Sequence, residues 1–253
     1  NVVININQDL IDRYGEYGVF ADVGDDGEID AGGERRSGVI LDRQGDDVMS
    51  VAMTVFGGGC GEETEIWGST TVNLNSGYAF QIFGGGEEGV VGKRTTNEEN
   101  GEEEYVYNAA YSTTVNLNGG TVTATDTDND GTVTSLAEAE YIYGGGNEGD
   151  VCGNTLVNLG NGRIFDAFGG ASNADILGAA EVYIGRQPDG SGDYKYGFPW
   201  IRDNVYGGND FGGTIKGTIG HAVGRIPFDA SLLESATFVK YIQGRVDSIF
   251  GGN

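Results

Sequence analysis

The stretch Thr71-Val72-Asn73-Leu74 alternates polar and apolar residues, and Ile82-Phe83-Gly84-Gly85 follows it after a short interval. Alternation with a period of two is typical of a β-strand with one buried face, so we expect Val72 and Leu74 to point inward and Asn73 outward. The glycine pair after the aromatic residue predicts a tight turn. Both patterns recur along the chain, and the recurrence indicates a repeat protein.

The repeat contains three short strand-like elements in a fixed order. Such a unit describes one rung of a three-faced solenoid, in which each strand pairs in parallel with its equivalent on the next rung. The predicted fold class is therefore all-β, a right-handed parallel β-helix with loop insertions. The copies of the first element are Val55-Phe56-Gly57-Gly58, Ile82-Phe83-Gly84-Gly85, Ile142-Tyr143-Gly144-Gly145, Ala167-Phe168-Gly169-Gly170, Val205-Tyr206-Gly207-Gly208 and Ile249-Phe250-Gly251-Gly252. The copies of the second element are Glu65-Ile66-Trp67-Gly68, Gly89-Val90-Val91-Gly92, Asp150-Val151-Cys152-Gly153, Asp175-Ile176-Leu177-Gly178 and Thr214-Ile215-Lys216-Gly217. The copies of the third element are Thr71-Val72-Asn73-Leu74, Thr114-Val115-Asn116-Leu117, Leu156-Val157-Asn158-Leu159 and Glu181-Val182-Tyr183-Ile184.

Register along such a solenoid places equivalent residues one above another. We expect one stack of aromatic rings and one outward stripe of apolar residues on the second element. The ring stack comprises Phe56, Phe83, Tyr143, Phe168, Tyr206 and Phe250, and the stripe comprises Trp67, Val91, Cys152 and Leu177.

Composition excludes several classes of protein. The 253 residues include 47 glycines and only three prolines, and apolar residues recur between the glycines, which excludes collagen and disordered linkers. A formal net charge of −25 repels phosphate backbones and anionic membrane surfaces, so no nucleic-acid partner is expected. The apolar runs are too short for a bilayer span, and membrane insertion is not expected. Strong acidity can also reflect adaptation to salt, in which case it identifies no ligand.

The order Phe/Tyr-Gly-Gly-Gly, x-Val-x-Gly, Thr-Val-Asn-Leu-Asn-Gly-Gly resembles right-handed parallel β-helix proteins of the pectate-lyase-like superfamily, especially glycine-rich repeat proteins secreted or displayed by gut bacteria. The resemblance covers about residues 51–253. It implies an extracellular or cell-surface location and a repeat fold. It leaves function open, because the superfamily includes lyases, hydrolases and adhesins.

The expected organisation is an N-terminal cap or degenerate rungs over residues 1–50 and β-helix repeats over 51–253. Insertions interrupt the repeats at about 93–111, 124–140 and 186–203. The chain is expected to be a piece of a longer parent, and a solenoid cut within its repeat can associate end to end. Insertions are the places where a repeat protein commonly carries its binding sites.

The insertion at 124–140 contains a candidate calcium site. Carboxylates at alternate positions of a tight loop, followed by glycine and a backbone ligand, are the arrangement that Ca²⁺ prefers. Ala137 stands where an EF-hand loop has its bidentate glutamate, so a solvated acidic turn is the alternative. The candidate ligands are Asp126, Asp128, Asp130 and Thr132.

The insertion at 186–203 contains four aromatic residues within a short span. Exposed rings would form a platform that stacks on sugars or on a protein partner, whereas packed rings would be the hydrophobic interior of the loop. The candidate ligand-binding residues are Tyr194, Tyr196, Phe198 and Trp200.

No catalytic set emerges from the sequence. His221 is the single histidine and has no placed partner, and lysine occurs at four positions only. We therefore expect a non-catalytic extracellular module, adhesin-like, that binds a glycan or a cell-surface partner and has calcium as a candidate cofactor. The alternative is a carbohydrate-active β-helix enzyme, a glycoside hydrolase or polysaccharide lyase, with paired aspartates in a groove.

Overall fold

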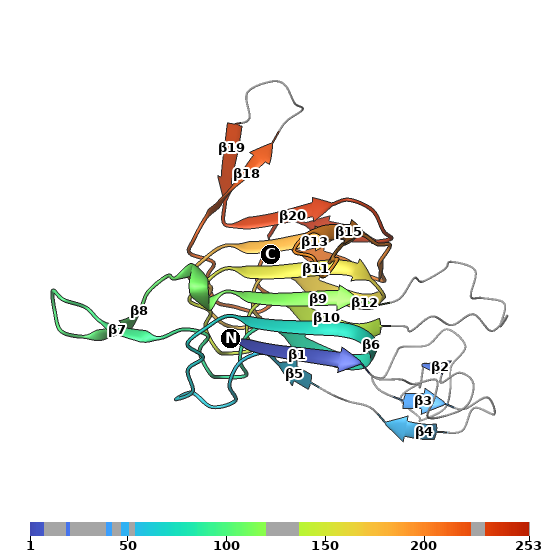
Figure 1. Cartoon of the computed structure of the whole chain (residues 1–253), viewed down its shortest axis with the longest axis horizontal. Helices are drawn as coiled ribbons and strands as arrows, with labels where there is room; N and C mark the ends of the chain where they lie inside the picture. Colours follow the sequence, from blue (N-terminus) through green and yellow to red (C-terminus); the bar gives the residue numbers. More distant parts are fainter. Residues whose placement is uncertain are drawn as a thin grey trace.

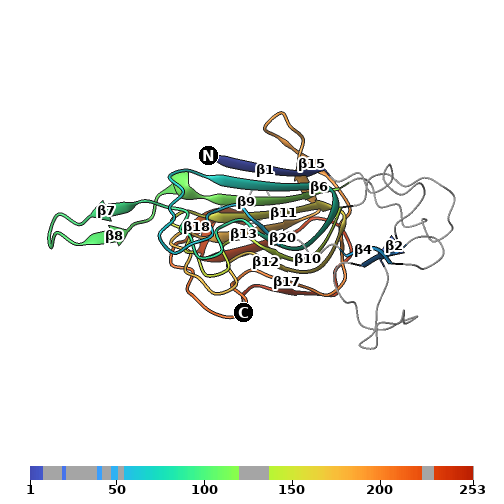
Figure 2. The same ribbon diagram turned by 90° about the horizontal axis from the view of Figure 1, so that it is seen from below.

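The computed structural model describes residues 1–7, 19–20, 39–41, 47–50, 54–119, 137–223 and 231–252. Within them the protein is all-β, with extensive parallel pairing, as the sequence predicts. A 12-stranded sheet contains two sets of strands, because β6 (Thr70–Phe83) is long enough to take part in both. In Figure 1 the strands of the first set lie one above another, and Figure 2 shows strands of the second set beside them.

We call the first set the first face. Its neighbouring strands are all parallel, and Val72 is aligned with Ile4 and Val115, while Val157 is aligned with Val182. The first face consists of β1 (Val2–Asn7), the first half of β6 (Thr70–Phe83), β9 (Thr113–Asn118), β11 (Thr155–Asn161), β13 (Ala180–Ile184) and β20 (Thr237–Tyr241).

The second face is also parallel, and it carries the aromatic-glycine motif. Phe83 is aligned with Phe56 and Tyr143, and Phe168 with Tyr206. Its strands are β5 (Thr54–Phe56), the second half of β6, β10 (Ala137–Tyr143), β12 (Arg163–Phe168), β17 (Asn204–Tyr206) and β21 (Ser248–Phe250), and β16 (Trp200–Ile201) also pairs with β12.

A third row consists of single parallel bridges. It joins Glu65 to Val90, Val91 to Val151, Val151 to Ile176, and Ile176 to Ile215. Val91 is therefore in register with Val151, and it is buried in a small apolar cluster with Ile176. The sequence analysis aligned Val91 with Cys152 in an outward stripe, and this register is wrong by one position. Cys152 is itself buried. Trp67, by contrast, is exposed as expected.

The remaining elements are short and lie outside these rows. They are β2 (Val19–Phe20), β3 (Val39–Leu41) and β4 (Asp47–Ser50), which form an antiparallel sheet; the hairpins β7 (Arg94–Thr96) with β8 (Glu103–Tyr105), β14 (Arg186–Pro188) with β15 (Tyr194–Tyr196), and β18 (Ile219–Val223) with β19 (Ser231–Ser235); and the 3-10 helix η1 (Ala109–Tyr111). Across the described ranges, no helix has the length and apolar character needed to cross a bilayer.

The main core lies between the first and second faces. Val72 and Leu74 are fully buried, and Asn73 between them is not, which confirms the predicted alternation. Facing them from the second face are Ile82, Ile142 and their equivalents. The core is thus a stack of aliphatic side chains whose inward direction follows from the period-2 geometry of each strand.

The predicted aromatic stack is confirmed. Neighbouring rings from Phe56 to Phe250 have centroids 4.6–5.0 Å apart and planes within 11° of parallel. Each internal ring therefore has both of its faces covered, and only its edge and any hydroxyl group point away from the stack. This limits the chemistry that the rings can offer to a ligand.

Candidate functional site

A row of asparagines runs along the outer side of the first face. Asn73 donates a side-chain hydrogen bond to Asn5, Asn116 donates to Asn73, and Asn158 donates to Asn116, over 2.8–2.9 Å. The next strand has Tyr183 at the equivalent position, so the side-chain oxygen of Asn158 has no asparagine to pair with. Arg186 supplies the donors instead, through Nε at 2.9 Å and a terminal nitrogen at 2.6 Å.

Arg186 also joins this row to the β14–β15 hairpin, which we call the edge hairpin. Its guanidinium carbon lies 3.3 Å from the ring centre of Tyr183 and 3.9 Å from that of Tyr194. Close approach of a guanidinium group to two rings combines cation–π attraction with van der Waals contact. Arg186 therefore anchors the edge hairpin to the first face and covers one side of Tyr194.

The structure exposes three of the four predicted aromatic residues of the insertion at 186–203. Tyr194, Tyr196 and Phe198 are 47%, 73% and 53% exposed. The backbone beneath them is held by Asn161, which accepts from the Phe198 amide at 2.7 Å, and by Gln243, which donates to the Gly197 carbonyl at 2.7 Å. The exposed rings are thus carried on a backbone that is tied to the body of the protein.

Trp200 lies apart from this exposed group. It belongs to β16, where Arg163 and Arg245 approach its ring with guanidinium carbons 5.0 and 5.1 Å from the centroid. Arg163 is in register with Trp200 on the neighbouring strand β12, and Arg245 is paired with Trp200 by a single parallel bridge. Trp200 is half-buried, and its contacts with the two guanidinium groups help to pack the sheet.

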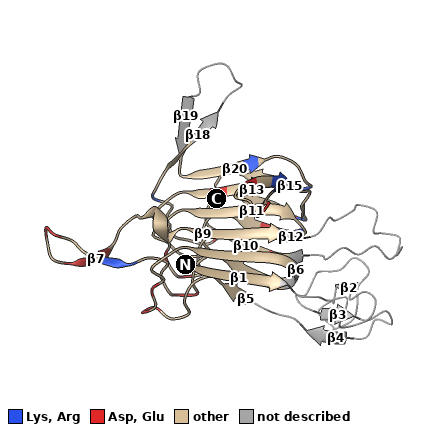
Figure 3. Ribbon diagram, viewed as in Figure 1, with Lys and Arg blue, Asp and Glu red and all other residues tan. Residues whose placement is uncertain are grey.

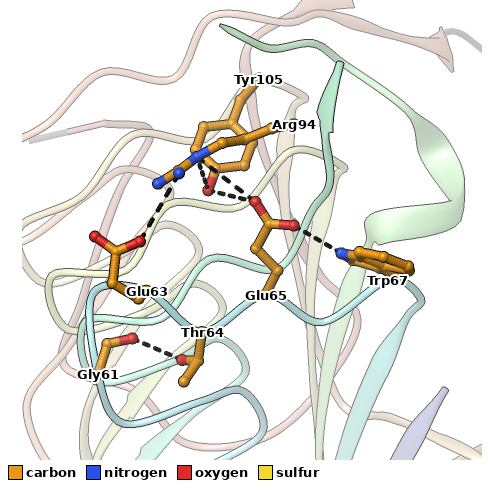
Figure 4. Close-up of polar contacts among 7 residues, drawn as sticks. All are labelled: Gly61, Glu63, Thr64, Glu65, Trp67, Arg94 and Tyr105. Atoms are coloured by element: carbon orange, nitrogen blue, oxygen red, sulfur yellow. Dashed lines mark hydrogen bonds and ion pairs between the residues drawn. The ribbon is translucent and has the colours of Figure 1, made fainter. Parts of the chain in front are cut away.

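The insertion at 93–111 extends away from the two faces as the β7–β8 hairpin (Figure 1). At its base Glu65 accepts hydrogen bonds from Trp67 at 2.7 Å and from the Tyr105 hydroxyl at 3.0 Å, and Arg94 donates to that same hydroxyl (Figure 4). The bond from Trp67 is the main cause that lowers the pKa of Glu65. Acidic residues continue along the hairpin beyond this base (Figure 3).

A cavity of about 410 Å³ lies on the outer side of the second face, and we call it the second-face cavity. Gln81, Tyr141 and Asp166 reach it from neighbouring strands at aligned positions. Tyr143 donates a hydrogen bond from its hydroxyl to Asp210 over 3.0 Å. The rest of the described lining is Phe168, Tyr206 and Phe211.

The second-face cavity perturbs its carboxyl groups. The pKa of Asp166 is raised to about 6, mainly by burial and in part by the nearby carboxylates of Asp203 and Asp210. The amide of Asn204, which donates to Asp166 over 2.9 Å, opposes this rise. Burial also raises the pKa of Asp210, while the bond from Tyr143 opposes that shift. Carboxyl groups with raised pKa values in a cavity mark a candidate site with a physical rationale.

Asp166 and Asp210 are absent from the residues that sequence reasoning selected. The sequence did contain a pattern that points to Asp166. The position two places before each aromatic residue of the repeat is always polar or tyrosine, and the residues at this position include Gln81, Tyr141, Asp166 and Asn204. Alignment of the copies places these residues in one outward row. Asp210, however, reaches the cavity from the turn after the glycine pair, and its direction depends on the tertiary structure.

The predicted calcium ligands Asp126, Asp128, Asp130 and Thr132 lie outside the described residues. Within the described ranges, no group of three or more His, Cys, Asp or Glu side chains is arranged to hold a metal ion. Cys60 is exposed and Cys152 is buried, and both are free thiols. Calcium binding therefore stays a prediction from the sequence.

A scan against protein-family models finds no match to the chain, and searches of curated proteins and of solved structures find none either.

Proposed function

We propose that the chain is a non-catalytic, adhesin-like module of the cell surface or extracellular space, built as a right-handed parallel β-helix that binds a glycan through the edge hairpin. The β-helix is supported by the three parallel rows, whose equivalent residues share one register. The extracellular setting rests on the resemblance of the glycine-rich repeats to secreted and surface-displayed proteins.

One observation carries the binding proposal. Tyr196 and Phe198 expose more than half of their surface on a backbone that Asn161 and Gln243 hold in place. Exposed aromatic rings on a preorganised backbone can stack on sugar rings without a large loss of conformational entropy. The guanidinium of Arg186 orients the adjacent Tyr194.

The test is a glycan screen with the intact chain and with the double variant Tyr196→Ala, Phe198→Ala. Tyr107→Ala is the matched control, because Tyr107 is 52% exposed on a different insertion. We expect the double variant to lose binding by about ten-fold or more, as is typical when anchoring aromatics are truncated. Equal binding by the double variant and the control would refute the role of the edge hairpin.

Calcium is part of the proposal on the strength of the sequence alone. Asp126, Asp128, Asp130 and Thr132 are the proposed ligands. Calorimetric titration with Ca²⁺ should release heat with the intact chain and not with Asp128→Ala. Absence of heat at millimolar Ca²⁺ would show that this segment is a solvated acidic turn and not a calcium site.

Self-association is a further part of the proposal. β20 and β21 are the last strands in the sheet order, and Tyr241, Ile249 and Phe250 at that edge are exposed. An edge strand offers unpaired backbone groups to another chain. Sedimentation over a range of concentrations should detect dimers or longer species, and a monomer at every concentration would count against this contact.

A further inference from the structure

The second-face cavity has a wall rich in hydrogen-bond acceptors. Its described lining includes the carboxylates of Asp166 and Asp210 and the side-chain amide of Gln81, and it contains no Lys, Arg or His. The Tyr143 hydroxyl directs its proton to Asp210, so its oxygen lone pairs stay available as acceptors. A ligand group that fits this wall is one that brings several donors.

Three of the aromatic residues in the described lining have both ring faces covered. Tyr143, Phe168 and Tyr206 stack on their neighbours and present only edges to the second-face cavity. Phe211 is 81% exposed at the rim. A positive charge is attracted to the face of a ring and not to its edge, so Phe211, the most exposed ring of the described lining, is suited to such contact.

Charge at the second-face cavity favours a cation. Asp203 lies close enough to raise the pKa of Asp166 together with Asp210, so three carboxylates interact electrostatically around this place. The whole chain carries a net charge of −25, and its field concentrates positive ions near the surface. Burial strengthens the attraction between a carboxylate and a cation relative to the same pair in bulk water.

We propose that the second-face cavity binds the ammonium or guanidinium group of an organic cation, held by Asp166 and Asp210 and covered by Phe211. An ammonium group has three donors and a guanidinium has five, and neither has an acceptor that would repel the carboxylates. Charge-assisted hydrogen bonds to carboxylates are the strongest that such groups make. This site is separate from the edge hairpin and does not depend on the glycan proposal.

A metal ion fits this wall less well. Calcium takes six to eight oxygen ligands and magnesium demands a near-ideal octahedron. The described lining supplies only two charged oxygen ligands, the carboxylates of Asp166 and Asp210, and its other oxygen-bearing groups are the Gln81 amide and tyrosine hydroxyls. Asp210 already accepts the Tyr143 hydroxyl proton. The volume of about 410 Å³ is also far larger than a bare ion needs, and it suits a small organic group.

The experiment is calorimetric titration of the intact chain at constant ionic strength. The probes are n-butylammonium and agmatine, an arginine-terminated peptide as a model of a protein partner, and n-butanol as the uncharged control. We expect heat from the cations and none from n-butanol. Tighter binding of the peptide than of agmatine would identify the source as a protein side chain, and tighter binding of agmatine than of the peptide would identify a small organic cation.

Two variants link binding to the second-face cavity. Asp166→Asn keeps the shape and the acceptor that the Asn204 amide uses, so it should fold and bind the cations about ten-fold more weakly. Asp193→Asn removes one charge from the exposed turn of the edge hairpin and does not alter the lining. Its affinity should match that of the unaltered chain.

The pH dependence of cation affinity provides an independent test of the role of Asp166. The groups around Asp166 are Asp203, Asp210, Tyr141, Tyr143 and Tyr206. The three tyrosines stay neutral over the acidic pH range, because burial raises their pKa values. With a pKa of about 6, Asp166 changes from mostly ionised to mostly protonated between pH 7 and pH 5. Cation affinity should fall about ten-fold over this interval in the intact chain, and less in Asp166→Asn.

Three results would overturn the proposal. The first is no heat with any cation at several millimolar, and the second is equal affinity of Asp166→Asn and Asp193→Asn. The third is release of reducing sugar from a glycan panel by the intact chain and not by Asp166→Asn, since this would assign the second-face cavity to a carbohydrate-active enzyme.

Discussion

Arg186 and Asp166 are the two residues whose surroundings determine the candidate sites. Arg186 completes the asparagine row and fixes Tyr194, because a guanidinium can donate to one oxygen while its flat faces stack on two rings. Asp166 holds a negative charge where burial and two other carboxylates disfavour it. Each residue thus connects the repeat scaffold to a place where a ligand can bind.

At the residue scale, Asp166→Asn should stabilise the fold at neutral pH. A carboxyl with a pKa of about 6 in the folded state and about 3.9 in the unfolded chain binds more protons when folded. Stability therefore falls as pH rises from about 4 to 6, and the neutral variant avoids this loss. Allowing for partial solvent exposure, we expect a gain of about 1 kcal/mol at pH 7.5 and little difference at pH 4.

Thermal or urea unfolding of the intact chain, Asp166→Asn and Asp193→Asn at both pH values measures this gain. The Asp193→Asn control accounts for the general benefit of removing one negative charge from an acidic protein. A gain of equal size in both variants would show that the surroundings of Asp166 do not penalise its charge.

At the element scale, the turns between stacked second-face strands require glycine, whereas Gly251 after β21 has nothing within 4 Å of an added β-carbon. A β-carbon on Gly84 would lie 2.2 Å from the carbonyl oxygen of Gly144, and one on Gly144 would lie 2.1 Å from that of Gly169. The hydroxyls of Thr113 and Thr155 donate to the same two carbonyl groups from the first face. The turns therefore stack backbone on backbone, and this explains the glycine pair that repeats in the sequence.

Gly144→Ala should destabilise the protein by more than about 2 kcal/mol, because the methyl group would overlap a backbone oxygen that cannot move alone. Gly61→Ala is the matched control, since nothing lies within 4 Å of its added β-carbon. We expect Gly61→Ala to change stability by less than about 0.5 kcal/mol. Chemical denaturation of both variants tests this, and similar stabilities would contradict the stacked-turn explanation.

At the scale of the whole molecule, charge is the dominant feature. The chain has 39 acidic and 14 basic residues, so its compact state brings like charges together. Several basic side chains are engaged locally, as with Lys216 and Asp175 at 2.6 Å and with Arg163 and Arg245 on Trp200. Local contacts of this kind leave the overall excess of negative charge in place.

Added salt should therefore stabilise the fold. The Debye length falls from about 20 Å near 20 mM salt to about 4 Å near 500 mM, which screens repulsion between exposed carboxylates. We expect the melting temperature to rise by several degrees in NaCl and equally in KCl at matched ionic strength. A flat or falling melting temperature would show that repulsion does not limit stability.

The amino-acid sequence alone determined the repeat scaffold, including the strand alternation, the glycine turns and the aromatic stack from Phe56 to Phe250. These features are local and periodic, so a period of two and a steric need for glycine reveal them without a structure. The register of Val91 was predicted wrongly, because a bridge of one or two residues is too short for an alternating pattern to show which residue points inward.

Only the tertiary structure decided which side chains meet across different strands and insertions. It separates Trp200, between Arg163 and Arg245, from the exposed Tyr196 and Phe198. It also brings Asp210, from a turn, to the same cavity as Asp166. Such contacts depend on where a turn directs its side chains. Unlike the side chains of a strand, those of a turn follow no regular period, so a sequence pattern does not predict their direction.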